Sequence, residues 1–172
     1  MRELIELSAP YRDSFLKGLR DLQADGRLLD YDLASIAADF AAFVRHLEEQ
    51  KDRTKIPAHR VPAVDYWLYE DRAILLGHLS LRYELNAFLL QVGGHIGYQI
   101  CPSHRRQGHG KAILQLGLAK ARAIGLRRVL VTCDETNLAS KKIIEANGGQ
   151  LENAILLEGD PIRKLRYWID LS

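Results

Sequence analysis

A basic segment with two glycines, at residues 105–111, has the composition of an anion-binding loop. In chain order its residues are Arg105, Arg106, Gln107, Gly108, His109, Gly110 and Lys111. A strand-like run at 94–100 precedes it, and an apolar helical run at 112–124 follows. Loop amides and the positive end of a helix dipole converge at such a junction. Glycine lets those amides approach a phosphate without an intervening Cβ. The spacing therefore predicts a site for a pyrophosphate.

Two common phosphate-binding patterns do not fit this segment. The Walker A loop requires a glycine five residues before the Gly-Lys pair and a Ser or Thr after it. Those positions hold Arg105 and Ala112. The dinucleotide fingerprint requires a third glycine where the chain has Ile113, and its acidic residue on a later strand is not evident. The pattern that does fit is R-x-x-G-x-G, beginning at Arg105.

This pattern resembles the acyl-coenzyme A pyrophosphate loop of the GNAT superfamily of N-acetyltransferases. A second element is similar to that family: after the run ending at Cys133 come Asn137 and, three positions on, the small Ser140. The resemblance implies that Asn137 contacts the pantetheine arm of the coenzyme and that Ser140 leaves room beside it. The alternative for Asn137 is a plain helix N-cap. Segments 93–98 and 146–149 look like a little-characterised bacterial branch of predicted acetyltransferases, which names no substrate.

The resemblance implies that an amine attacks the thioester of acetyl-CoA directly. In the family, a splay between two adjacent strands frees a backbone N–H for the carbonyl oxygen, which here places Ile100 or Cys101 at the acetyl group. Many members carry a tyrosine seven residues after the Asn as the acid for the leaving thiolate. Here that position is Ile144. Because a thiol has a pKa of about 8.5, such an acid helps the reaction without being obligatory.

Three side chains are candidates for proton transfer. His95 opens the central strand, and its ordinary pKa of about 6.5 suits a base; the alternative is a packed histidine at a strand end. Glu84 ends the preceding strand and serves either as base or amine anchor, or as a solvated charge. Tyr98 lies on the opposite face of the strand from His95. It replaces the missing tyrosine only if that face is the catalytic one.

The composition narrows the class of protein. With 172 residues, 47% hydrophobic content and a net charge of +2, we expect one domain over 1–172 and no nucleic-acid partner. The chain has no apolar run of about 18 residues and no signal-peptide pattern, so we expect no membrane contact and a cytoplasmic location. The histidines lack metal-ligand spacing, which predicts no metal site. Cys101 and Cys133 are expected to be buried, reduced thiols.

The elements that must position these residues follow from hydrophobic periodicity. Helical spacing predicts helices over 13–24, 32–50, 108–124 and 138–147, with a short helical or irregular connection at 86–92. Strands are expected over 2–7, 64–70, 73–81, 94–100, 128–133, 150–157 and 162–169. This order favours an α/β fold. The resemblance specifies it as a mixed, mostly antiparallel central sheet of about seven strands with helices on both faces.

The acceptor is not specified by the sequence. A small-molecule amine and a peptide amine both remain open, and segments 22–31, 51–62 and 83–92 are expected to form its site. A homodimer is common in the family. Two other functions also remain open: a non-catalytic module that binds acyl-CoA, favoured by the Ile144 departure, and a regulator that binds another phosphate ligand at the same loop.

Overall fold

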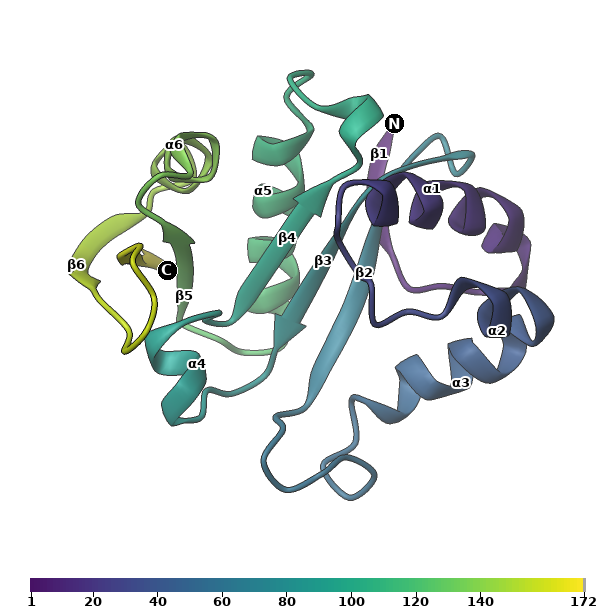
Figure 1. Ribbon diagram of the computed structural model, residues 1–172, viewed down its shortest axis with the longest axis horizontal. Helices are drawn as coiled ribbons and strands as arrows, with labels where there is room; N and C mark the ends of the chain where they lie inside the picture. Colours follow the sequence, from purple (N-terminus) through teal and green to yellow (C-terminus); the bar gives the residue numbers. More distant parts are fainter. Residues whose placement is uncertain (172) are drawn as a thin grey trace.

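The computed structural model describes residues 1–171, and its element order is that of the expected α/β fold (Figure 1). The strands are β1 (Arg2–Ile5), β2 (Ala63–Glu70), β3 (Ile74–Arg82), β4 (Ile96–Ile100), β5 (Arg128–Asp134), β6 (Gln150–Ile155) and β7 (Lys164–Asp170). The helices are α1 (Arg12–Ala24), α2 (Leu33–Ala38), α3 (Phe40–Glu49), α4 (Ala87–Gln91), α5 (His109–Ala123) and α6 (Leu138–Glu145), with 3-10 turns at Ala9–Tyr11 and Pro102–His104. Within residues 1–171, no helix has the length and apolarity to cross a membrane. The same residues hold no group of three His, Cys, Asp or Glu side chains suited to a metal ion.

The seven strands are antiparallel, as expected, but they form two hydrogen-bonded sheets in the orders β1-β2-β3-β4 and β5-β7-β6. The sheets meet just before β4, where the amide of His95 donates to the carbonyl of Leu130 at 2.8 Å. Gly94 makes this approach possible, because its φ is +61° and a Cβ there would lie 2.2 Å from the Leu130 oxygen. Beyond this contact β4 and β5 diverge (Figure 1). The strands are therefore divided at the strand that precedes the glycine loop, where the family resemblance implied a splay.

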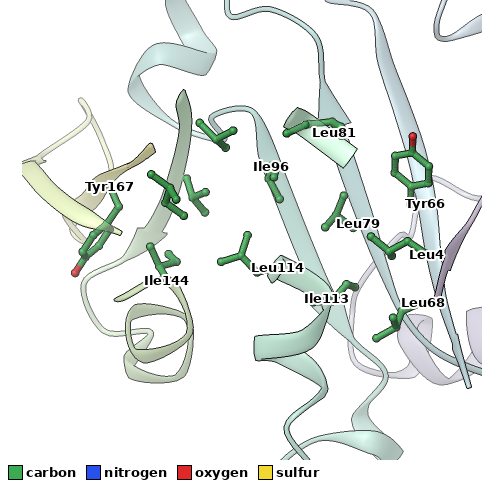
Figure 2. Close-up of a cluster of buried hydrophobic side chains, with 14 of the residues drawn as sticks. Leu4, Tyr66, Leu68, Leu79, Leu81, Ile96, Ile113, Leu114, Ile144 and Tyr167 are labelled. Atoms are coloured by element: carbon green, nitrogen blue, oxygen red, sulfur yellow. The ribbon is translucent and has the colours of Figure 1, made fainter. Parts of the chain in front are cut away.

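Two hydrophobic cores cover the two faces of the larger sheet. Strand β2 shows the alternation, since Tyr66 and Leu68 belong to one core and Trp67 and Tyr69 to the other. The first core packs the sheet against α5 and α6 and extends to the smaller sheet (Figure 2). The second packs it against α1, α2 and α3 and includes the edge-to-face contact of Phe15 with Trp67, whose ring centroids lie 4.7 Å apart. Helices thus cover both faces, as predicted.

The helix predicted over 32–50 is two helices, because the chain leaves the helical conformation at Asp39. Its φ is −138°, and its carboxylate accepts a hydrogen bond of 2.8 Å from the amide of Ala42, which caps α3. An aspartate side chain competes with the helical backbone in this way and favours caps over helix interiors. The break between α2 and α3 bends this segment around the side of the sheet where a cavity opens.

Candidate functional site

The N-terminus of α5 has unsatisfied backbone amides. Gly108 is the N-cap with a φ of +79°, and no side chain caps the helix. The first bond within the helix runs from the amide of Ala112 to the carbonyl of Gly108 at 3.2 Å. The amides of residues 109–111 therefore have no acceptor inside the helix. A Cβ on Gly108 would meet no atom within 4 Å, so the space before these amides is open. Arg106 and Lys111 are both exposed, and the arrangement suits an anion.

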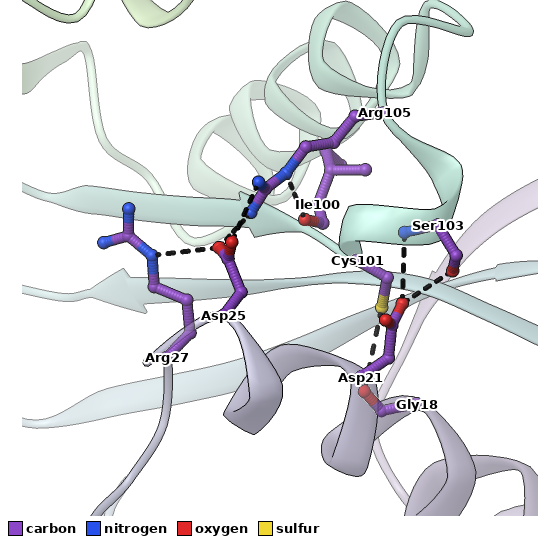
Figure 3. A network of polar contacts seen from close by, with 8 residues as sticks. All are labelled: Gly18, Asp21, Asp25, Arg27, Ile100, Cys101, Ser103 and Arg105. Carbon is purple, nitrogen blue, oxygen red and sulfur yellow. Dashed lines mark hydrogen bonds and ion pairs between the residues drawn. The ribbon is translucent and has the colours of Figure 1, made fainter.

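Arg105 does not share in this open charge. Its guanidinium pairs with Asp25 at the end of α1, and its Nε donates to the carbonyl of Ile100 at 3.2 Å (Figure 3). The hydrogen bond from Arg105 is the main reason that the pKa of the Asp25 carboxyl lies below its ordinary value. In this structure the charge of Arg105 is therefore paired, and the residue fixes the end of β4. The ring of His109 is buried, so its part in the predicted loop would come from its backbone amide.

The backbone of β4 distinguishes the two predicted amides. The Cys101 amide donates to the carbonyl of Leu76 at 2.9 Å, so it is not available to a ligand. Because antiparallel partners alternate between bonded and non-bonded pairs, the neighbouring pair of Ile100 with Gly77 directs the Ile100 amide away from β3. The Ile100 amide therefore points toward the side on which β5 has separated from β4. The Ile100 carbonyl points there too, since Arg105 reaches it (Figure 3).

Asn137 and Ser140 lie along the other border of this divergence, after β5, and Tyr98 reaches them from β4. The Asn137 side-chain oxygen accepts from the Ser140 amide at 3.1 Å and caps α6, so the capping interpretation is correct for that oxygen. The Ser140 hydroxyl lies 2.9 Å from the Tyr98 hydroxyl, which links α6 to β4. Burial raises the pKa of Tyr98 to about 12. Ile144 lies fully buried in the core (Figure 2), and Tyr98 is the tyrosine that contacts α6 from β4.

The structure does not bring His95, Glu84 and Tyr98 together. His95 is 8% exposed, and its Nδ1 accepts a hydrogen bond of 2.9 Å from the amide of Leu130. Burial, together with the nearby Arg82 charge, lowers its pKa to about 4. Glu84 is exposed and forms an ion pair with Arg53. His95 thus fastens β4 to β5, as in the packed alternative, and Glu84 has the environment of a surface charge.

A cavity of about 1130 Å³ opens on the α1–α3 face of the larger sheet. Its wall mixes polar and charged side chains with apolar ones, which include Ile36 and Phe43 from the helices and Phe88 from α4. All three segments that were expected to form the acceptor site contribute to its lining, at residues 28–31, 59–61 and 86–89. His95, Glu84 and Tyr98 do not line it.

The floor of this cavity carries a polar cluster that was not among the predicted site residues. Nε2 of His78 lies 2.9 Å from a carboxylate oxygen of Asp65, whose other oxygen accepts from the Tyr31 hydroxyl at 3.1 Å. Nδ1 of His78 lies 3.3 Å from the amide nitrogen of Gln99. A signal was present, because Asp65 and His78 are polar residues inside strands that are otherwise apolar. Their proximity depends on the register of β2 against β3 and could not be read from spacing.

Comparisons with known proteins agree with this geometry. The model of the acetyltransferase (GNAT) family matches residues 31–148. The structure of the microcin C7 self-immunity acetyltransferase MccE, solved with acetyl-CoA and AMP, superposes with a TM-score of 0.69 at 12% identity, covering 98% of this chain and 92% of that one. A Salmonella typhimurium acetyltransferase that modifies the N-terminal serine of a 50S ribosomal subunit protein gives 0.66 at 19% identity, covering 99% and 95%.

A further solved structure is a chimera of the spermidine N-acetyltransferase SpeG from Vibrio cholerae with hSSAT. It gives a TM-score of 0.65 at 12% identity, covering 99% of this chain and 95% of that one. At such identities these likenesses show the fold alone. No curated protein matches the sequence significantly.

Proposed function

Because this chain belongs to the acetyltransferase (GNAT) family, we propose that it transfers the acetyl group of acetyl-CoA to a primary amine by direct attack. The observation that carries this proposal is the uncapped N-terminus of α5, which opens with Gly108 beside the point where β4 and β5 have diverged. A pyrophosphate at the amides and an acyl arm between the strands would use both features. The acetyl-CoA in the MccE structure supports this choice of coenzyme.

In this proposal each part of the coenzyme has a named partner. The pyrophosphate lies on residues 106–111, held by helix amides and by the charges of Arg106 and Lys111. Asn137 uses its free side-chain nitrogen toward the pantetheine arm, and Ser140 borders that arm. The Ile100 amide donates to the acetyl oxygen, where negative charge develops during attack.

Tyr98 is the proposed acid for the leaving group. When the amine nitrogen bonds to the carbonyl carbon, the carbon–sulfur bond breaks and the sulfur leaves as a thiolate. With a pKa raised to about 12, the Tyr98 hydroxyl is protonated at neutral pH and has a proton to give. Its contact with Ser140 holds it between β4 and α6, so a residue from β4 takes the role that Ile144 cannot perform.

The cavity on the α1–α3 face is the proposed acceptor site. Asp30, Asp32 and Asp39 line it and favour an ammonium, while Arg60 and Arg82 also border it. The structurally similar proteins act on spermidine and on a ribosomal protein. A small amine and a peptide amine are therefore both acceptors to test.

Calorimetric titration of acetyl-CoA and of ATP into three proteins tests the coenzyme site. Gly108→Trp fills the open space before the α5 amides, and Gly125→Trp is the matched control beyond the other end of α5. Both glycines have a positive φ, and a Cβ added at either one would meet no atom within 4 Å, so the backbone strain is comparable. We expect micromolar acetyl-CoA binding by the wild type and Gly125→Trp, weakened by about tenfold or more, at least 1.4 kcal/mol, in Gly108→Trp.

Each contrary result has a definite meaning. Folded protein that does not bind acetyl-CoA would contradict the proposal, and a preference for ATP would favour the phosphate-binding regulator. Binding without release of free thiol in the presence of any primary amine would leave a non-catalytic acyl-CoA module as the function.

A further inference from the structure

The polar cluster in the cavity floor is largely buried. Asp65 and His78 have side-chain exposures of 16% and 8%, and their neighbours include Trp67, whose ring centroid lies 4.5 Å from that of His78. Burying a carboxylate and an imidazole is costly unless they are paired, and hydrophobic residues of similar size often serve stability as well. The pair lines the cavity, which indicates a role toward a ligand.

The contacts of the cluster determine which nitrogen of His78 carries a proton. Burial alone would raise the pKa of Asp65, but the contacts with His78, Ser80 and Tyr31 outweigh it and hold that pKa below its ordinary value. An ionised carboxylate only accepts hydrogen bonds, so Nε2 of His78 donates to it. Nδ1 of His78 then carries the ring's lone pair, which accepts a hydrogen bond of 3.3 Å from the side-chain amide of Gln99; an ammonium that takes the place of this amide would meet the same lone pair.

His78 lies on β3, next to the strand that carries the proposed acetyl site. His78 is the register partner of Gln99 on β4, and the residue after Gln99 is Ile100, whose amide is proposed for the acetyl oxygen. Gly97 lies two residues before Gln99 on β4 and has no side chain. The nearest atom to a Cβ there would be a guanidinium nitrogen of Arg82 at 3.8 Å. The Arg82 guanidinium, from a residue that lines the cavity, therefore lies beside the backbone of β4 at Gly97.

We propose that His78 is the general base that deprotonates the acceptor amine, with Asp65 as the positioning residue that fixes its tautomer. The inference rests on the proposed function. An ammonium that enters the cavity gives a proton to Nδ1 of His78, and the resulting imidazolium is stabilised by Asp65. The neutral amine forms the nitrogen–carbon bond as the carbon–sulfur bond breaks. Of the two protons that the nitrogen loses, one ends on the coenzyme thiol and the other in solvent.

The test measures kcat and KM for His78→Gln against acceptors that differ in amine pKa. The series consists of an alkylamine, which is protonated at neutral pH, and an aniline and a hydrazide, which are not. His104→Gln, a histidine outside the cavity, is the matched control, and calorimetry with acetyl-CoA shows that each variant keeps its coenzyme site. Tyr31→Phe is a milder variant that removes one contact with Asp65 and leaves no large cavity.

For His78→Gln we expect kcat with the alkylamine to fall by roughly 10²- to 10⁴-fold, the usual contribution of a general base. With the aniline and hydrazide we expect a fall of less than about tenfold, because those nitrogens arrive neutral. Tyr31→Phe should lower kcat for the alkylamine more than for the aniline. An equal loss with all three acceptors, or a change confined to KM, would overturn the inference. Wild-type protein that binds acetyl-CoA but acetylates no amine would overturn the proposed function itself, and with it this inference.

Discussion

Tyr98 is a residue whose role can be separated from its packing. Tyr98→Phe removes the proposed acid and one hydrogen bond to Ser140 while keeping the ring. We expect kcat to fall about tenfold or more, KM for acetyl-CoA to stay within about twofold, and the free energy of unfolding to fall by about 1 kcal/mol. Steady-state assays of thiol release and urea unfolding measure the three quantities.

Ser140→Ala is the companion variant, because it breaks the same hydrogen bond but leaves the Tyr98 hydroxyl in place. A similar loss of stability with a much smaller loss of kcat is expected. Full activity of Tyr98→Phe would show that the thiolate leaves without this acid.

His95 couples the stability of the fold to pH. Its pKa in the folded protein is about 4, against 6.5 for the unperturbed group, so the unfolded chain takes up the proton first as the pH falls. The stabilisation is complete above about pH 6.5 and is lost progressively toward pH 4. The shift corresponds to about 3 kcal/mol. Denaturant unfolding of the wild type and His95→Gln at several pH values measures it.

The comparison of the two proteins isolates His95 from other groups that titrate in the same range. A glutamine can still accept from the Leu130 amide but does not ionise. We expect the difference in stability between wild type and His95→Gln to shrink as the pH falls from 6.5 to 4. Parallel curves would mean that His95 titrates alike in the folded and unfolded chains.

Residues of the proposed coenzyme loop could be named from the sequence because their signal is local. Gly108, Gly110 and Asn137 stand at fixed short spacings beside a helix start, and that spacing is visible in the sequence. The pairing of Arg105 with Asp25 could not be read from the sequence, because the two residues lie 80 positions apart. The pairing of Asp65 with His78 was missed for the same physical reason: it depends on strand register and on the loop that carries Tyr31.

At the scale of elements, the β4–β5 junction depends on Gly94. A Gly94→Ala substitution places a Cβ 2.2 Å from the Leu130 carbonyl oxygen at a φ of +61°, which combines backbone strain with a clash against backbone. We expect the free energy of unfolding to fall by at least about 2 kcal/mol. Acetyl-CoA binding should weaken as well, because the strands that border the arm are forced apart.

Gly148→Ala separates strain from clash. Its φ is +86°, and a Cβ there meets no atom within 4 Å, so only the conformational cost of about 1 kcal/mol applies. Equal losses of stability in the two variants, measured by urea unfolding, would show that the close approach at Gly94 is relieved at little cost.

The element boundaries show where sequence patterns stop being informative. The bounds of all seven strands were predicted to within two residues, because buried strands carry dense β-branched and aromatic runs. The break at Asp39 was missed because Ile36, Phe40 and Phe43 continue a single apolar face across it. The separation of β4 from β5 was expected only from the family resemblance, because no local pattern distinguishes it: the segments on both sides are each good strands.

At the scale of the whole molecule, β4 lies between the two proposed binding sites. The proposed coenzyme site lies at the α5 and α6 side of the divergence, and the proposed acceptor cavity lies on the α1–α3 face. His78 on β3 lines the cavity, while Tyr98 on β4 contacts α6. The proposed base and acid are thus on opposite faces of the larger sheet. This arrangement suits a reaction in which both substrates are bound at once.

The kinetic mechanism follows from this arrangement and from the cysteines. Burial raises the pKa of Cys101 to about 12 and also raises that of Cys133, so neither forms the thiolate that an acetyl-enzyme would require at neutral pH. We therefore expect a ternary complex, seen as intersecting lines when initial rates are measured against both substrates. Cys101→Ala and Cys133→Ala should keep kcat within about threefold, since neither thiol is the nucleophile. Parallel lines, together with a mass gain of one acetyl group after incubation with acetyl-CoA alone, would instead require a covalent intermediate and would contradict direct attack.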